Sequence, residues 1–142
     1  MDPINTFSLE RHAGEYHTWP PRSRLIHNGI ILDLSLPGYD LIRQYDTIDG
    51  FLFVTDYDSP YGEATNFIFV DKRVERVLSE RSFGGMYASF WLEDLFWHDA
   101  RNFTALLSGC EYVFTIRSFF IPYFYPKLGI RVGESPTGRR SG

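Results

Sequence analysis

The chain has 142 residues, of which 44% are hydrophobic and 18% aromatic, and its formal net charge is −4. This length fits one domain, and the apolar content argues against disorder over most of the chain. Six acids and no Lys, Arg or His lie between Gln44 and Asp71. Such an acidic block repels phosphate backbones, so direct nucleic-acid binding is disfavoured.

The sequence shows no targeting segment and little cysteine chemistry. No window contains the roughly 20 consecutive apolar residues that a membrane helix needs. The first twelve residues lack the basic and apolar regions of a secretory signal. The one cysteine, Cys110, precludes an internal disulfide and is interpreted as a small buried or half-exposed thiol. We therefore expect no membrane association and a cytoplasmic location.

The first 24 residues are poorly periodic. They include Trp19-Pro20-Pro21, whose paired prolines cannot continue a helix or a central strand. An irregular N-terminal arm is therefore expected over residues 1–24, packed down by aromatic side chains such as Phe7, Tyr16 and Trp19.

Five strands are expected next, over residues 25–36, 39–48, 51–57, 64–70 and 74–80. The first alternates apolar and polar residues from Gly29 onward, which is typical of a half-buried strand. Asp49-Gly50 predicts a two-residue hairpin turn, and Ser59-Pro60-Tyr61-Gly62 a type I turn. Strands 51–57 and 64–70 are apolar on successive residues, which indicates burial on both faces.

The second half begins with a segment that allows two structures. Residues 89–98 have apolar side chains at helical spacing and a serine that can cap a helix, which favours one short helix. A strand is the alternative, because the segment is short and aromatic. A brief strand or helical turn is expected over 103–107, a strand over 111–121 and an edge strand over 123–132.

Together these elements predict one mainly-β domain over residues 1–132, followed by a flexible tail over 133–142. Successive strands with short connections are typical of an antiparallel meander. We expect the meander to form a sandwich or a partly open barrel with one short helix, which leaves an α+β class as the variant.

The acidic, aromatic turn after residue 56 is the strongest candidate for a site. Paired carboxylates allow acid–base chemistry or cation binding, but Pro60 and Phe67 occupy positions where a calcium loop needs oxygen ligands. A solvated turn and a protein-binding patch are the remaining interpretations. The predicted partner-binding residues are Asp46, Asp49, Asp56, Tyr57, Asp58, Tyr61 and Glu63.

Other catalytic signals are weak. His98-Asp99 is the most site-like pair, but such a pair is more often a surface feature than a catalytic one. The sequence contains neither a Gly-x-Ser-x-Gly nor a nucleotide-binding glycine motif. No enzyme activity, metal or cofactor is therefore expected.

A small, acidic, aromatic-rich β domain of this kind resembles the immunity proteins encoded beside bacterial polymorphic toxins, including Rhs-type and type VI secreted effectors. The resemblance lies in Gln44-Tyr45-Asp46, in the acidic turn 56–61 and in the strand that follows to Asp71. It implies binding of one cognate toxin domain and occlusion of its active site or substrate entry. A basic toxin surface is expected, because complementary charge speeds association.

Two alternatives remain open. One is a small-molecule-binding domain or enzyme, with an aromatic pocket near Trp91, Trp97 and His98. The other is a structural or adaptor subunit whose apolar strand edge pairs with another chain.

Overall fold

The computed structural model describes residues 1–57, 64–84, 90–121 and 124–133. These residues form three antiparallel sheets and one short 3-10 helix, η1 (Tyr16–Thr18). The first sheet has the order β2 (Phe7–Leu9), β3 (Arg22–His27), β4 (Ile30–Pro37). The second has the order β1 (Asp2–Pro3), β5 (Asp40–Asp46), β6 (Gly50–Asp56), β7 (Thr65–Asp71), β8 (Val77–Phe83). The third has the order β12 (Leu128–Val132), β11 (Cys110–Ile116), β10 (Asn102–Leu107), β9 (Leu92–Trp97).

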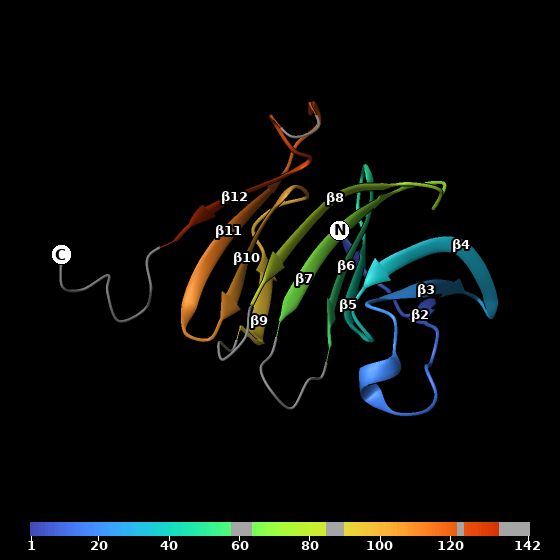
Figure 1. The fold of residues 1–142 in the computed structure, drawn as a ribbon. Coiled ribbons are helices and arrows are strands. Elements are labelled where there is room, and N and C mark those ends of the chain that lie inside the picture. Colours follow the sequence, from blue (N-terminus) through green and yellow to red (C-terminus); the bar gives the residue numbers. More distant parts are fainter. Residues whose placement is uncertain (58–63, 85–89, 122–123, 134–142) are drawn as a thin grey trace.

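The five-stranded sheet lies between the other two, so the molecule has three layers (Figure 1). One hydrophobic core fills the space between this sheet and the four-stranded sheet, and a second lies under the three-stranded sheet. None of the three sheets in the described ranges closes into a barrel. The predicted mainly-β, sandwich-like class is confirmed.

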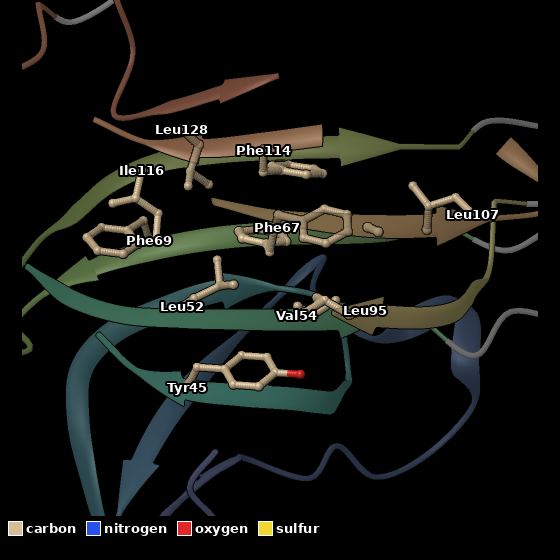
Figure 2. Packing of buried hydrophobic residues seen from close by; sticks show 12 residues of the cluster. Tyr45, Leu52, Val54, Phe67, Phe69, Leu95, Leu107, Phe114, Ile116 and Leu128 are labelled. Atoms are coloured by element: carbon tan, nitrogen blue, oxygen red, sulfur yellow. The ribbon is translucent and has the colours of Figure 1, made fainter. Parts of the chain in front are cut away.

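Strands β6 and β7 are buried on both faces, as their unbroken apolar runs predict. Leu52 and Val54 pair with Phe69 and Phe67 and face the four-stranded sheet, while Phe53 faces the second core. Figure 2 shows the side chains that face the four-stranded sheet, such as Leu52 and Phe67, packed against side chains from β10, β11 and β12. Each fully buried side chain of this type contributes about 1.5–3 kcal/mol, so the two strands supply much of the hydrophobic stabilisation.

The segment 25–36 is a hairpin rather than the single strand expected. Asn28 and Gly29 have φ values of 52° and 84°, and β3 pairs with β4 across them. Both positions of a type I′ turn need positive φ, and Asn-Gly is the dipeptide that tolerates it best. The alternation from Gly29 onward is real, but it describes β4 alone.

The hairpin between β5 and β6 is confirmed, but its turn is one residue earlier than predicted. Thr47 donates its backbone N–H and its hydroxyl to the Gly50 oxygen, both at 2.8 Å, so Ile48 and Asp49 form the loop. Gly50 belongs to β6, where a Cβ would lie 2.1 Å from the oxygen of Val70. Glycine is needed there for a close approach of two backbones and not for the turn.

The predicted helix over 89–98 is wrong, because residues 92–97 form strand β9. Leu95 pairs with Ala105 and Trp97 with Phe103, which places both side chains against the first core, whereas Phe96 is exposed. Apolar residues in this segment match both a helical and an extended spacing. Pairing with β10 decides between them, and the aromatic residues suit a strand.

The expected irregular arm also contains regular structure. β1 pairs with β5, and β2 pairs with β3, which places Phe7 in the second core. Of the strand or helical turn expected over 103–107, the structure has the strand, β10. The strand expected over 111–121 is present as a shorter β11, and the expected edge strand begins at Leu128. The predicted turn 59–62 lies outside the described residues, as does the tail beyond Gly133. No helix in the described ranges is long and apolar enough to cross a membrane.

Candidate functional site

Two of the predicted binding acids are engaged in ion pairs within the molecule. Asp46 pairs with Lys72 on the surface. The Asp49 carboxylate accepts hydrogen bonds from the Arg101 guanidinium and, at 2.9 Å, from Lys127 Nζ. Lys127 is only 4% exposed. Asp49 therefore joins the five-stranded sheet to the four-stranded sheet and is not a free charge for a partner.

The environment of Asp49 favours its ionised form. Hydrogen bonding from Arg101, followed by that from Lys127, lowers the pKa of the Asp49 carboxyl from its ordinary value of 3.8, although burial acts in the opposite direction. The carboxylate is consequently charged throughout the neutral range, as a structural ion pair requires.

Asp56 and Tyr57 lie at the end of β6, next to a second group of aromatic residues. The Tyr39 N–H donates to the Asp56 backbone oxygen at 2.8 Å, and the Tyr39 and Tyr57 rings are 5.1 Å apart. The other predicted site residues, Asp58, Tyr61 and Glu63, lie outside the described residues.

Tyr39 is the centre of this aromatic group. Its ring meets those of His12, Tyr16, Trp19 and Tyr57 at centroid distances of 5.1–5.5 Å and interplanar angles of 74–90°. Edge-to-face pairs of this kind are each worth about 0.5–1.5 kcal/mol beyond their burial. The rings come from four separate stretches of chain, so their packing fixes the N-terminal segment against β5 and β6.

These rings line a pocket of about 220 Å³, which we call the aromatic pocket. Its lining residues are Glu10, Arg11, His12, Tyr16, Trp19, Tyr39, Asp40 and Tyr57. A wider depression of about 660 Å³ shares Arg11, Tyr39 and Asp40 with it and runs over β2 and β5; we call this the groove. The pocket and the groove are therefore adjacent on the surface.

Hydrogen bonds to main-chain atoms hold the pocket together. Tyr16 Oη donates to the Tyr57 oxygen at 2.9 Å, and Tyr57 Oη donates to the Pro21 oxygen at 3.1 Å. Trp19 Nε1 donates to the Gly14 oxygen at 3.3 Å. Two tyrosines thus tie the segment around η1 to the end of β6, and the Pro21 oxygen that accepts from Tyr57 also accepts from the Gly38 N–H, at 3.4 Å.

One hydrogen bond determines the tautomer of His12. Ser23 Oγ donates its only proton to the Gly38 oxygen at 2.7 Å, and it lies 2.8 Å from His12 Nε2. His12 Nε2 must therefore be the donor in this contact. In the neutral ring Nδ1 is then the acceptor. The contact with Ser23 of β3 holds the His12 ring in place beside Tyr39.

The electrostatics of the pocket combine neutral phenols with carboxylates. Burial raises the pKa of the Tyr39 and Tyr57 hydroxyls, so both stay protonated at neutral pH. The Arg24 backbone N–H, which donates to Glu10 at 2.7 Å, lowers the pKa of that carboxyl. Asp40 lies 4.0 Å from the largely exposed Arg11 guanidinium.

Trp91, Trp97 and His98, the residues of the alternative pocket predicted from the sequence, line neither the aromatic pocket nor the groove. Trp97 packs in the core at 4.7 Å from Phe103, whereas Trp91 is 47% exposed. The two residues are six positions apart along the chain, which separates their Cα atoms by up to about 20 Å in an extended segment. His98 contacts the Thr104 hydroxyl at 2.6 Å instead of meeting a second catalytic group.

Asp99 and Cys110 have surface roles. The Asp99 carboxylate accepts from the backbone N–H groups of Arg101 and Asn102, which lower its pKa and shape the turn before β10. Cys110 is exposed at the start of β11, so the prediction of a buried or half-exposed thiol is wrong. Within the described ranges, no three His, Cys, Asp or Glu side chains are grouped to hold a metal ion.

Tyr57 is the one predicted site residue that lines the aromatic pocket. Tyr16 and Trp19 were interpreted as packing residues of the arm, and Tyr39 as part of a strand. The available signal is local: Trp19 and Tyr39 stand beside a proline or a glycine near the ends of elements.

Comparison of the chain with protein-family models, with curated proteins and with solved structures gave no match.

Proposed function

We propose that the protein is an immunity protein, which binds one cognate toxin domain and blocks its active site or substrate entry. The observation that carries the proposal is the convergence of Tyr16, Trp19, Tyr39 and Tyr57 on one open pocket. Tyr and Trp dominate binding hot spots because they combine a large contact area with a polar tip. In this proposal the aromatic pocket and the groove are the contact surface.

The size of the pocket favours a protein partner over a metabolite. Sites for small molecules usually have about 300–1,000 Å³ and enclose most of the ligand. The aromatic pocket has about 220 Å³, enough for one side chain. The groove is larger, at about 660 Å³, and most of its lining residues belong to β2 and β5. A side chain in the pocket and a segment along the groove fit a protein surface.

Charge supports a basic partner. Glu10 and Asp40 line the pocket, and Asp56 lies at the end of the neighbouring strand. Asp58 and Glu63 follow directly in the sequence and stay in the proposal with Tyr61. Asp46 and Asp49 are instead engaged in ion pairs within the fold, with Lys72 and with Arg101 and Lys127, so they are not part of the proposed contact surface. The cytoplasmic location and the absence of catalysis are further parts of the proposal.

The proposal is tested with the reading frames that flank the gene. Each flanking frame is expressed in a bacterial host, alone and together with this protein, and growth is measured. We expect one frame to arrest growth alone, to be tolerated with this protein, and to form a complex that elutes as one species in size-exclusion chromatography. If no flanking frame is toxic, or if growth arrest persists in the presence of the protein, the proposal is refuted.

The contact surface is tested in that complex with a matched pair of variants. Trp19→Ala removes a ring of the pocket and should weaken binding by about 2 kcal/mol or more, which is about 30-fold in Kd. Trp91→Ala removes an exposed indole outside the pocket and should leave Kd within about twofold. Equal effects of the two substitutions would place the interface elsewhere.

A further inference from the structure

We propose that the aromatic pocket binds a guanidinium group, supplied by an arginine side chain of the partner. The aromatic rings of Tyr16, Trp19 and Tyr39 and the carboxylates of Glu10 and Asp40 line one small, open cavity. The identity of the partner rests on the proposed function. The chemistry of the pocket does not, and it can be measured without that partner.

The rings supply the first half of the recognition. Aromatic faces have a negative quadrupole, so a cation within about 6 Å of a ring centroid is attracted to them. Tyr39 and Trp19 meet nearly at a right angle, 86°, with centroids 5.1 Å apart. Two walls at this angle let a planar cation stack on one ring while its edge meets the other. A compact ammonium lacks this planar fit.

The carboxylates supply the second half. The low pKa of Glu10 keeps that group ionised, but its oxygens are already engaged with Arg24. Asp40 differs, because its contact with Arg11 is a 4.0 Å ion pair longer than a hydrogen bond. The Arg11 side chain is 91% exposed. An incoming guanidinium can therefore form a two-pronged hydrogen bond with Asp40 at little cost to the existing structure.

The pocket residue Arg11 already places a guanidinium beside Asp40, on a side chain that is 91% exposed. Arg11 lines both the pocket and the groove, beside Asp40, without a short hydrogen bond to it. A partner arginine replaces this weak internal contact with a stronger one and stacks on the rings that line the pocket. The pocket also selects its ligand by size, because a volume of about 220 Å³ admits the end of an arginine side chain but not a bulky cation.

The experiment is an NMR titration of the full chain with capped amino acids. The probes are Nα-acetyl-arginine methylamide, its lysine counterpart, and the citrulline counterpart, which has nearly the shape of arginine without the charge. The indole N–H signal of Trp19 is the readout, assigned by its loss in Trp19→Phe. We expect a saturable shift with the arginine probe at a Kd of about 1 mM, typical of a fragment-sized ligand. Binding of the lysine probe should be weaker, and the citrulline probe should cause no saturable shift.

Two variants with the same charge change locate the carboxylate. Asp40→Asn should weaken the arginine probe about fivefold, the upper range for an exposed ion pair. Asp33→Asn, on the exposed side of β4 and outside the pocket lining, should leave the Kd unchanged. Both side chains lie on the surface, so neither substitution should disturb the fold. Unchanged positions of the remaining backbone amide signals confirm that each variant is folded.

Four results would overturn the inference: no saturable Trp19 shift up to about 20 mM arginine probe, an equal response to citrulline, equal affinity for lysine, or equal effects of Asp40→Asn and Asp33→Asn. The proposed function fails separately. A toxin neutralised by a protein that ignores the arginine probe removes the guanidinium assignment alone. Probe binding without any neutralised toxin removes the immunity role and leaves the pocket chemistry standing.

Discussion

The ion-pair network of Asp49 makes a sharp prediction about stability. Asp49→Asn keeps the size of the side chain and removes its charge. The carboxylate holds Lys127 Nζ at 2.9 Å and Arg101 Nη2 at 3.0 Å. At an effective dielectric constant near 20, each contact is worth about 5–6 kcal/mol before desolvation is subtracted. The net effect depends on what becomes of the two cations.

The two cations differ in their access to water. The Arg101 side chain is 33% exposed and can be solvated when Asp49 loses its charge. Lys127 is 4% exposed, and its Nζ lies 5.5 Å and 5.4 Å from the ring centroids of Phe69 and Phe120. Removing one partner of a buried pair typically costs about 3–5 kcal/mol. With one cation of the two rescued by water, we expect a loss of about 3 kcal/mol.

Urea denaturation followed by fluorescence measures this loss. With a slope of about 1–3 kcal/mol per molar, the midpoint should fall by roughly 1–3 M. The matched control is Asp46→Asn, whose partner Lys72 and own side chain are both more than 40% exposed, so its cost should stay below about 1 kcal/mol. Asp49→Asn combined with Lys127→Met should recover part of the loss. A change for Asp49→Asn no larger than for the control would refute the reasoning.

The same variant predicts a dependence on pH. The pKa of Asp49 is lowered in the folded protein, chiefly by the Arg101 hydrogen bonds. A lowered pKa stabilises the folded state above the unfolded value, and this stabilisation is lost as the pH falls through the folded value. The difference in unfolding free energy between the wild type and Asp49→Asn should therefore shrink as the pH falls below about 3.8. A constant difference through that range would show that the carboxylate acts by packing alone.

Three further substitutions and one control test the fold. Gly50→Ala places a Cβ 2.1 Å from the Val70 oxygen, so a backbone shift costing about 1–3 kcal/mol should lower the melting temperature; an unchanged melting temperature would contradict the close approach. Phe67→Ala empties the first core and should cost about 3–5 kcal/mol in urea denaturation, whereas Phe124→Ala, at 86% exposed, should stay within about 0.5 kcal/mol. Gln44→Ala removes a side-chain amide that accepts from the Phe7 N–H of β2 at 3.0 Å and donates to the Phe7 oxygen at 2.9 Å. It should cost about 1–2 kcal/mol and increase hydrogen exchange there; protection equal to the wild type would contradict the role.

The sequence predicted those parts of the fold that depend on local pattern. The apolar runs around Phe53 and Ile68 require cover on both faces, and the structure supplies a sheet on each side. Asn28-Gly29 is an equally local signal, but the apolar residues on both sides of it hide the turn. The role of Gly50 is not local at all, because the atom that excludes a side chain belongs to the next strand.

The candidate site depended on contacts between distant residues. Tyr57 was identified because it stands among acids, and its neighbours Tyr39 and Trp19 are 18 and 38 residues earlier in the chain. No periodicity links three such positions. For the acids, the sequence predicts a binding residue where the structure has an internal ion pair, since charge alone made Asp49 a binding candidate. Whether an acid is free depends on which cation the fold brings to it, here Lys127 from 78 residues away.

The order of the sheets has a consequence for how the protein folds. Apart from the two residues of β1, each sheet is built from one uninterrupted part of the chain: β2–β4, then β5–β8, then β9–β12. Every strand pair within these parts joins neighbours in sequence, so loop-closure costs are small at that stage. We expect the hairpins to form early and independently, and the docking of the two outer sheets onto the middle one to be the cooperative step. The N-terminal β1, which pairs only when β5 is in place, then closes the edge of a sheet that is already assembled.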